Sequence, residues 1–391
     1  MSLVFKELGV LVDFKGGGTP SRNVEEYWAN SIPWATVKDL NEGITLTETQ
    51  EFISELGLKN SASNLITKGT IIIPTRMALG KVVISEIDVA INQDLKAVFV
   101  KDKEKLDVKY LLRFLESNKE NIVSMGKGAT VKGITLDQLK AIKIPLPPLA
   151  EQRRIASILD QADELRQKRQ QAIEKLDQLL QATFIDMFGD PVSNPKGWEK
   201  KKIKQVLTKL TDGTHHSPPA MDEGIPYITA KHIKEGFIDF YSKPTFVSIE
   251  DHKAIYSRCD PIQGDVLYIK DGATTGIASI NYFDFEFSLL SSVALLRPNP
   301  KLLTSDYLES WLNHKTVKQN ILQNMGGAAI KRLTLAKIKD LDILVPNLEN
   351  QNIFSKVKRQ IYIQRQILER SFNIQNDLFQ SLQNQAFNGT L

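Results

Sequence analysis

The sequence predicts an α+β protein with two mostly β domains, related by a pseudo-twofold axis and separated by two long helices that form an antiparallel coiled coil. Three observations lead to this prediction. The chain repeats itself, each copy begins with short runs of strand-forming residues, and each copy ends with a long segment of heptad spacing. At 391 residues the chain also exceeds the usual length of one domain.

The internal repeat has an offset of roughly 193 to 199 residues. Its clearest stretch aligns residues 128–136 with residues 327–335, which share glycine, alanine, lysine, threonine and leucine at the same places. Further matches at a similar offset are Ile32–Trp34 with Ile225–Tyr227, Gly69 with Gly264, and Gly80 with Gly276. The chain therefore consists of two copies of one plan, near 1–190 and 191–391.

Each copy is predicted to divide into a β-rich domain and a long helix. Apolar, β-branched runs that are separated by glycine, proline and asparagine are typical of strands. Such runs are 70–73, 81–84 and 96–100 in the first copy, and 265–269 and 293–296 in the second. We expect a first domain over 1–150, a first central helix over 151–190, a second domain over 191–347 and a second central helix over 348–391.

Heptad spacing indicates both helices, and a proline precedes each start, at Pro148 and Pro346. The apolar seam of the first helix is Ile155, Ile158, Ala162, Leu165, Ala172, Leu176 and Leu179. In the second helix, Phe354, Val357, Ile361 and Leu368 keep the pattern, whereas Gln364, Ser371 and Gln375 place polar groups on it. Two such helices in one chain most simply pack against each other, and polar seam residues would fix their register.

Composition excludes several classes of protein. No apolar run approaches the roughly 20 residues of a membrane span, and Met1–Lys15 lacks the layout of a signal peptide. The single cysteine, Cys259, excludes an internal disulfide and a cysteine-cluster zinc site. We therefore expect a cytoplasmic protein. Its net charge of +4 is small, so tight binding to DNA would need positive charge from a partner.

A duplicated domain on a helical spacer suits the recognition of a divided DNA site. Duplex DNA has local twofold axes, so two readers related by a twofold axis meet two half-sites in equivalent ways. Segments 41–64 and 239–258 show little likeness outside the shared framework. Different loops on one framework indicate two readers with different targets.

The residues at the helix starts resemble a known family. Pro145–Ala156, followed by the heptad helix, resembles the first central helix of the specificity subunit of type I restriction-modification systems, and Pro346–Gln351 resembles its degenerate second copy. Motifs similar to those of the family's target recognition domains are Gly16–Ser21, Ile32–Trp34, Thr211–His215 and Gly264–Leu267. The second helix departs from the pattern, with Asn350 in place of glutamate and no arginine pair after Gln351.

The resemblance implies a DNA specificity subunit without catalytic activity. Each domain would read one half of a bipartite, asymmetric site, and the central helices would set the spacer and bind two adenine methyltransferase (modification) subunits. Restriction/translocase subunits can join such assemblies. The chain itself would bind no cofactor, because S-adenosylmethionine, ATP and Mg²⁺ belong to the partners. The predicted partner-binding residues are Gln152, Arg153, Arg154 and Gln351.

Patterns that suggest catalysis are incomplete. Phe14–Gly18 fits a methyltransferase glycine signature, but no Asp/Asn-Pro-Pro-aromatic partner follows, and Ser217–Ala220 lacks the aromatic ring. Asp190 with Glu199 and Lys201 resembles the set of carboxylates and lysine in a nuclease active site. However, the stretch around Glu199 resembles the ordinary start of a recognition domain. No phosphate-binding loop for ATP is present. All five histidines lie in the second copy, so we predict no metal site.

Candidate DNA contacts are polar and cationic residues in glycine-rich loops, which can reach phosphates and base edges. In the first copy they are Thr19, Ser21, Arg22, Thr36, Lys38, Arg76, Lys81, Lys127, Thr130 and Lys132. In the second copy they are Thr214, His215, His216, Thr229, Lys231, His232, Lys270, Thr274, Thr275, Lys331 and Arg332.

Two alternatives remain open from the sequence. One is the specificity subunit of a type IIB-like restriction enzyme, which cuts on both sides of its site. The other is a coiled-coil scaffold with no nucleic-acid role.

Overall fold

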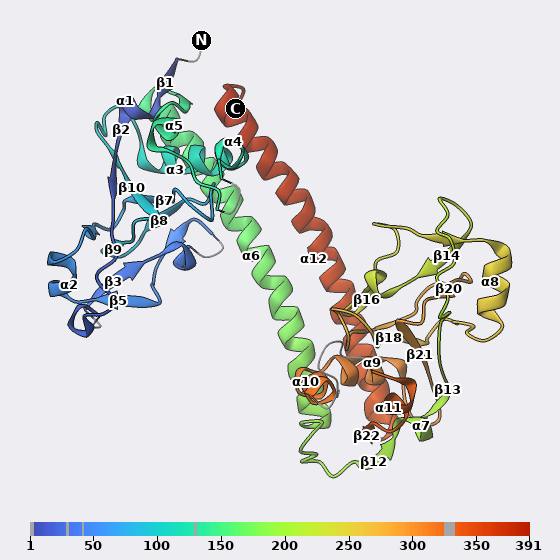
Figure 1. The fold of residues 1–391 in the computed structure, drawn as a ribbon. Coiled ribbons are helices and arrows are strands. Elements are labelled where there is room, and N and C mark those ends of the chain that lie inside the picture. Colours follow the sequence, from blue (N-terminus) through green and yellow to red (C-terminus); the bar gives the residue numbers. More distant parts are fainter. Residues whose placement is uncertain (1–3, 29–30, 41–42, 129–130, 324–332) are drawn as a thin grey trace. The chain divides into compact units, whose positions relative to one another are not determined.

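A computed structural model describes residues 4–28, 31–40, 43–128, 131–323 and 333–391. The chain forms two compact units (Figure 1). The first unit joins Met1–Gln170 with Arg370–Leu391, and the second is Gln171–Glu369. Both are β-rich and each includes parts of two long helices, which confirms the predicted fold class. Within the described residues, no helix combines the length and apolar composition that a membrane span requires.

The described residues of the first unit include two β-sheets of more than two strands. The larger has the order β2 (Val12–Gly16), β10 (Leu95–Val100), β7 (Ile71–Pro74), β8 (Val83–Ser85) and β4 (Thr45–Leu46). The smaller has the order β5 (Glu51–Ile53), β3 (Ile32–Ala35), β9 (Val89–Ile91) and β6 (Asn64–Ile66). Three short helices follow, α3 (Val108–Ser117), α4 (Lys119–Met125) and α5 (Leu136–Lys140).

The central strand β7 is apolar throughout because both faces of its sheet are covered. Ile71 and Ile73 point to one face and join the core that contains α3 and the start of α6 (Leu149–Phe188). Ile72 points to the other face and packs in a second core with residues of the smaller sheet, including Ile66 and Ile91. The continuous hydrophobic run in the sequence is thus a strand buried between two layers.

The second unit repeats this plan. Its larger sheet has the order β13 (Leu207–Asp212), β21 (Val293–Pro298), β18 (Val266–Ile269) and β19 (Ala278–Ile280). Its smaller sheet has the order β17 (Phe246–Val247), β14 (Ile225–Ile228) and β20 (Ser288–Leu289). The helices α9 (Ser305–Asn313), α10 (Lys315–Gln323) and α11 (Leu335–Lys339) follow.

Short elements complete the two units. In the first they are β1 (Phe5–Glu7) paired with β11 (Lys143–Pro145), α1 (Leu8–Leu11), α2 (Glu55–Lys59) and the 3₁₀ turns η1 (Glu25–Tyr27) and η2 (Val37–Asp39). In the second they are β12 (Glu199–Lys202) paired with β22 (Asp342–Val345), β15 (Ile233–Lys234) paired with β16 (Phe237–Ile238), α7 (Ile203–Val206), α8 (Ile249–Tyr256) and η3 (Ala230–His232).

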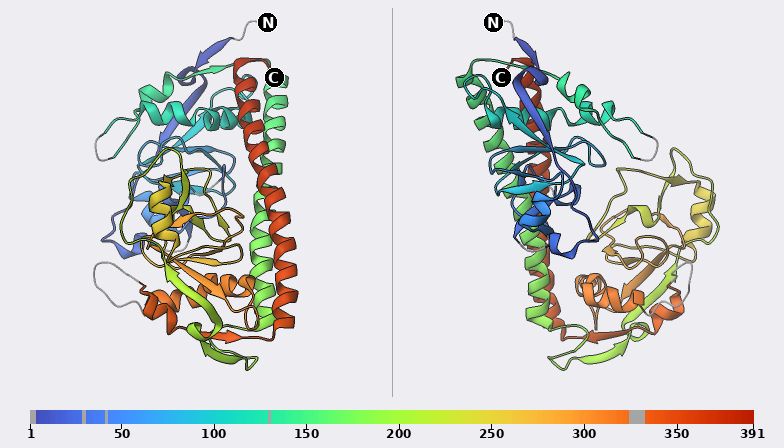
Figure 2. Two further views of the ribbon diagram at one scale, coloured as in Figure 1. Left: turned by 90° about the vertical axis from the view of Figure 1, so that its right-hand side faces the viewer. Right: turned by 60° about the vertical axis from the view of Figure 1, so that its left-hand side comes forward.

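The long helices α6 and α12 (Leu348–Asn388) run antiparallel within each unit. Figure 2 shows the start of each helix beside the end of the other. In the first unit, Arg166 donates to Asn376 at 3.4 Å. In the second unit, the equivalent Arg365 lies 3.3 Å from Asp177, the equivalent of Asn376. The predicted pairing of the two helices is therefore confirmed, with an equivalent Arg–Asn or Arg–Asp contact in each unit. The predicted seam is only partly right, because Leu165 and Leu179 are 58% and 50% exposed.

The end of α12 completes the core of the first unit. Phe379 is 5% exposed and belongs to the same core as Tyr110 and Phe114 of α3. The ring of Phe387 lies 5.5 Å from that of Tyr110 and 5.3 Å from that of Phe114. The first domain therefore depends on residues that the second copy supplies.

Replacing Phe379 by alanine is expected to destabilise the first unit, although the residue lies in the second copy. Loss of a buried phenyl ring costs about 3–5 kcal/mol of unfolding free energy. Hydrogen exchange should show reduced protection in residues 70–145. Leu378→Ala, at a 54% exposed neighbour, should change stability by no more than about 0.5 kcal/mol. Reduced protection confined to the second unit would contradict this arrangement.

Candidate nucleic-acid interface

A glycine lets the first strand of each larger sheet cross a strand of the smaller sheet. A Cβ on Gly17 would lie 1.8 Å from the carbonyl oxygen of Ile91, at the end of β9. A Cβ on Gly213 would lie 1.8 Å from the carbonyl oxygen of Leu289, at the end of β20. No side chain fits at either position, so glycine is required by close approach. Both units thus present a loop at the same place on the framework.

In the first unit, this loop meets the ends of β7 and β10. The hydroxyl of Thr19 donates to the side-chain oxygen of Gln93 at 2.5 Å. The guanidinium of Arg76 lies 4.0 Å from the carboxylate of Asp94 and is largely exposed. Lys96 lies beside them, and burial lowers the pKa of its ammonium group. Three segments that are far apart in the sequence therefore form one polar edge.

A fourth segment joins the same edge. Lys127 and Gly133 exchange two backbone hydrogen bonds of 2.9 Å, which close the loop between them, and Gly133 also forms a bridge with Arg76. Lys127 and Lys132 are both exposed. The edge is therefore predominantly cationic, as a surface that approaches phosphates requires. The predicted residue Thr130 lies outside the described residues, as do Lys331 and Arg332 of the second copy.

The equivalent edge of the second unit contains a buried ion pair. Lys270, which occupies the place of Thr75, is 2% exposed. Its ammonium group lies 2.8 Å from Asp271 and 3.4 Å from Asp212. A lysine held in this way cannot reach DNA without breaking both contacts, so the prediction that Lys270 contacts DNA does not fit its position.

Two exposed basic side chains, Arg258 and His215, lie beside the buried Asp212. The guanidinium of Arg258 donates to the carbonyl oxygens of Asp212, at 3.0 Å, and of Gly213, and its side chain is 51% exposed. The Nε2 atom of His215 lies 3.5 Å from the Asp212 carboxylate. Arg258 was missed from the sequence because it follows α8, far from any glycine-rich motif.

A 3₁₀ turn presents an exposed lysine in each unit. Thr36 N–H donates to the Asp39 carboxylate at 2.7 Å, and Lys38 between them is exposed. In the second unit, Thr229 N–H donates to Nδ1 of His232 at 3.0 Å, and the exposed lysine is Lys231.

His232 is part of the core and not a DNA contact. It is fully buried, and its Nε2 atom lies 3.0 Å from the carbonyl oxygen of Lys243. Because Nδ1 accepts a hydrogen bond, the ring proton resides on Nε2 and is donated to that carbonyl. Burial lowers the pKa of His232, which agrees with a neutral ring. These contacts give His232 a structural role and do not suit the predicted DNA contact.

The remaining residues that were predicted to contact DNA differ in how accessible their side chains are. Arg22 forms a two-point ion pair with Glu51, at 2.6 and 3.0 Å, and stacks on the ring of Trp28 at 3.6 Å. Lys81 donates to the carbonyl oxygen of Leu40 at 2.5 Å. Thr275 is buried and donates to Gly272. Thr214 lies at the glycine crossing and is partly buried, whereas Ser21, His216 and Thr274 are exposed loop residues.

The two glutamines that were predicted to bind a partner instead fix the helix starts. The Gln152 amide donates to the carbonyls of Lys105 and Pro147, at 2.8 and 2.9 Å, and accepts from Asp107 N–H at 2.9 Å. Gln351 is bound in the same way, by two carbonyls and one N–H, those of Leu302, Pro346 and Thr304. Both side chains are fully buried, so neither offers a surface to another protein.

The adjacent arginines remain accessible. The side chain of Arg153 is 65% exposed and lies 3.7 Å from Asp107. Arg154 pairs with Glu151 at 2.7 Å and donates to the carbonyl oxygen of Leu391 at 3.0 Å. Among the described residues, no three His, Cys, Asp or Glu side chains form a metal-binding group.

Two copies of one framework, each with exposed polar loops at the same place and each packed on a long helix, define a two-module recognition protein. The family model of the type I restriction modification DNA specificity domain matches residues 3–175 and 195–376. The chain therefore belongs to this family. It is the DNA specificity subunit of a type I restriction-modification system, a non-catalytic part of that complex, and not a simple scaffold.

Relatives of known sequence and structure agree with this assignment. The MjaIX specificity subunit of Methanocaldococcus jannaschii is 25% identical over 366 residues, which cover 87% of this chain and 82% of the relative. The EcoR124I/EcoR124II specificity subunit of Escherichia coli is 38% identical over 169 residues, 41% of each chain. The fold resembles the crystal structure of a type I S subunit from M. genitalium, with a TM-score of 0.62, 15% identity, and coverage of 99% and 96% of the two chains.

Gln152→Leu is expected to destabilise the first unit because it leaves two carbonyls and one N–H buried without partners. Such a loss costs about 1–3 kcal/mol, which urea unfolding can measure. Arg153→Leu, next to it and largely exposed, is the matched control and should leave stability unchanged. If Gln152→Leu kept full stability and only prevented assembly with other subunits, the assigned role would be wrong.

Proposed function

We propose that the domains over 1–150 and 191–347 are target recognition domains that each read one half of a bipartite, asymmetric DNA site. The observation that carries this proposal is the shared glycine crossing at Gly17 and Gly213, which holds different loops on an equivalent framework. A frame shared by both copies, with different side chains, suits two readers with different half-sites.

The polar edges support unequal half-sites. The first edge offers exposed Arg76, Lys127 and Lys132. The second edge offers Arg258 and His215 around a buried carboxylate. Arginine and lysine can bind both phosphates and the acceptor edge of guanine, so these residues are the proposed DNA contacts together with Thr19, Lys38 and Lys231.

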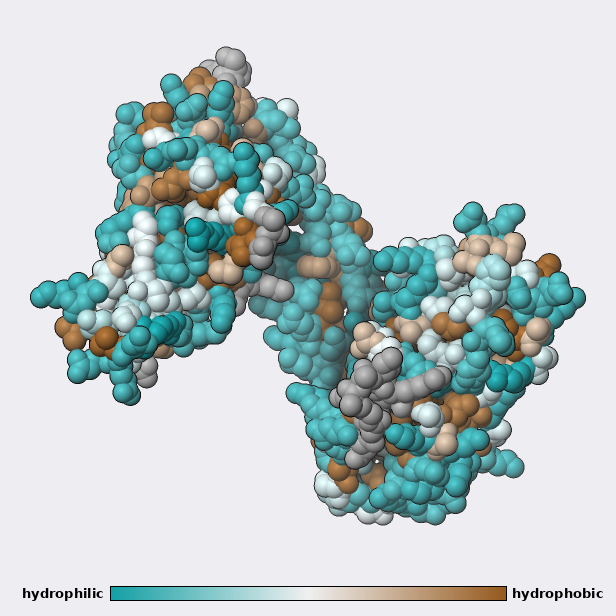
Figure 3. All heavy atoms as spheres, in the orientation of Figure 1, coloured by the Kyte–Doolittle hydropathy of each residue, from teal (hydrophilic) through white to brown (hydrophobic). Residues whose placement is uncertain are grey.

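The helices over 151–190 and 348–391 would set the spacer and bind two methyltransferase subunits. Support comes from exposed aliphatic residues on helices that already have a paired face. The surface in Figure 3 is mostly hydrophilic, with hydrophobic spots. On the helices, Leu165 and Leu179 of α6 and Ile363, Ile367 and Ile374 of α12 are between 41% and 68% exposed. Such residues are suited to contact another protein.

The remaining reaction chemistry would belong to other subunits. We propose that the methyltransferase subunits supply the S-adenosylmethionine site, and that restriction/translocase subunits, where present, supply the ATP and Mg²⁺ sites. The predicted cytoplasmic location is part of this proposal.

Exchanging residues 1–150 for the first domain of another family member should change one half-site and leave the other unchanged. Sequencing methylated sites in cells that express the chimera with its methyltransferase subunit measures both halves together. The reciprocal exchange of 191–347 is the control and should change the opposite half. A change in both halves after either exchange would reject modular reading.

Inserting one heptad into α6 and one into α12, at residues 170 and 370, should lengthen the spacer and keep both half-sites. Seven helical residues add about 10 Å, and a base pair adds 3.4 Å, so we expect about 3 base pairs. Alanine substitutions at the same exposed positions, without insertion, should keep the original spacer. An unchanged spacer after insertion would show that the helices do not measure the distance.

A further inference from the structure

The two units use opposite charges where a domain helix meets the start of its long helix. In the first unit the domain helix α3 is basic there, and the start of α6 is acidic. In the second unit the domain helix α9 is acidic, and the start of α12 is basic. All of these side chains are described within one unit each, so the comparison concerns two separate local interfaces.

In the first unit, the buried cation is on the domain helix. Arg113 of α3 is 3% exposed. Its guanidinium lies 2.8 Å from Asp160 and 3.0 Å from Asp163, both on α6. Lys109 of α3 also lies 3.0 Å from Asp160. Arg113 also pairs with Glu116 of its own helix at 2.8 Å, so two cations and one carboxylate of α3 meet two carboxylates of α6.

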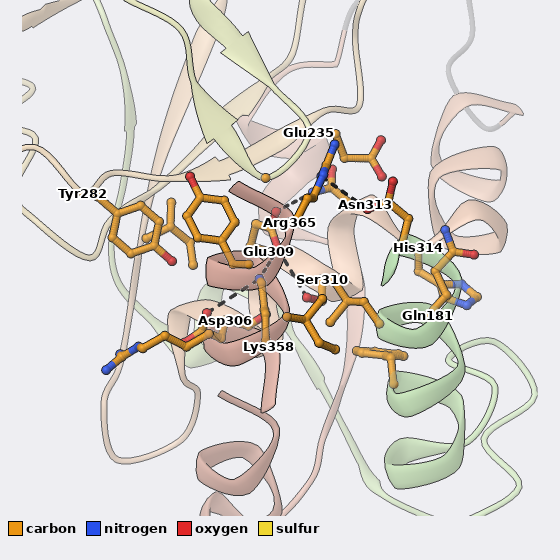
Figure 4. A pocket seen from close by; sticks show the side chains of 18 residues that line it. Gln181, Glu235, Tyr282, Asp306, Glu309, Ser310, Asn313, His314, Lys358 and Arg365 are labelled. Atoms are coloured by element: carbon orange, nitrogen blue, oxygen red, sulfur yellow. Dashed lines mark hydrogen bonds and ion pairs between the residues drawn. The ribbon is translucent and has the colours of Figure 1, made fainter. Parts of the chain in front are cut away.

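In the second unit, the buried cation is on the long helix. Lys358 of α12 is 8% exposed. Its ammonium group lies 3.7 Å from the carboxylate of Asp306 and forms a close ion pair with Glu309, both on α9. Figure 4 shows Lys358 between these two acids. The domain helix therefore contributes the carboxylates here.

The repeat aligns the two interfaces residue by residue. Tyr110 and Tyr307 donate to the carbonyls of Pro145 and Leu344, both at 2.9 Å, which fixes the register of α3 against α9. The buried glutamines fix the register of α6 against α12. Equivalent positions are therefore Lys109 and Asp306, Leu112 and Glu309, Arg113 and Ser310, Leu159 and Lys358, Asp160 and Arg359, and Asp163 and Tyr362.

A cavity in the second unit reflects the same exchange. Its volume is about 650 Å³, and its lining includes Ser310, Tyr362 and Leu180. The first unit has Arg113 and Asp163 at two of these positions and the large side chain of Phe379 at the third. The guanidinium of Arg113 lies 5.8 Å from the centre of the Phe379 ring. The second unit thus has a cavity where the first unit has a buried ion pair and a phenyl ring.

We infer that these charge clusters are positioning residues that allow each recognition domain to pack only on its own helix. Placed on α6, the second domain would bring Asp306 against Asp160 and bury Glu309 against Leu159. Placed on α12, the first domain would bring the buried Arg113 against Arg359 and Tyr362, which offer no carboxylate. Buried charges without partners are strongly unfavourable. The inference rests on the proposed two-reader function but concerns which domain can occupy which position.

A full-length chimera tests this inference. The plain chimera joins residues 195–346 to residues 148–391, so that a copy of the second domain precedes α6. The variant chimera is the same chain with Asp306→Lys, Glu309→Leu and Ser310→Arg in that copy only. The three changes restore the charge pattern of α3. We expect the midpoint of thermal unfolding to be on the order of 10 °C lower in the plain chimera than in the variant chimera. Equal midpoints, or failure of both chimeras to fold, would overturn the inference.

The reciprocal control places the same three substitutions in the native second domain of the natural chain. Lys358 then loses both carboxylates, so this variant should lose stability by a similar shift, and a native midpoint would also overturn the inference. DNA binding is measured separately, on a duplex with two copies of the second half-site. A stable variant chimera that does not bind this duplex would contradict the proposed reading function. It would not contradict the inference about domain packing.

Discussion

The structure depends on an exchange of helix ends. Each recognition domain packs on the start of its own long helix, and the end of the other helix completes its core. Phe379 and Phe387 fill the first core. Phe184 and Phe188 fill the second, where their rings contact those of Tyr307 and Phe354. Because neither core is complete within one half of the repeat, the antiparallel pairing of the helices is a condition for folding both domains.

This construction separates what must stay constant from what can vary. The close crossings at Gly17 and Gly213 and the buried amides of Gln152 and Gln351 occur at equivalent positions and are satisfied entirely within the chain. The loops that the crossings hold carry different side chains in the two units. A rigid frame with variable loops is how a specificity subunit can change its target without changing its fold.

Several site predictions from the sequence do not suit the positions of the residues, for one reason. Lys270, His232, Gln152 and Gln351 have the side chains expected of DNA or partner contacts, but all four are buried and bonded within the chain. Residue type shows what a group can bind, whereas burial decides whether it is available. Arg258 shows the reverse case, because an exposed arginine reaches the polar edge beside Asp212 from a segment with no motif.

The sequence by itself determined the duplication, the two β-rich domains, the heptad helices and the family, because each is a local or periodic property of the chain. The tertiary structure decided which loops meet at each edge and which polar groups remain exposed. It also decided that the two domains pack on their long helices through ion pairs of opposite polarity. These properties depend on contacts between segments far apart in the chain, such as Arg113 with Asp163 and Lys358 with Glu309. A local pattern cannot specify such contacts, because the same residue type is compatible with either environment until its neighbours are fixed.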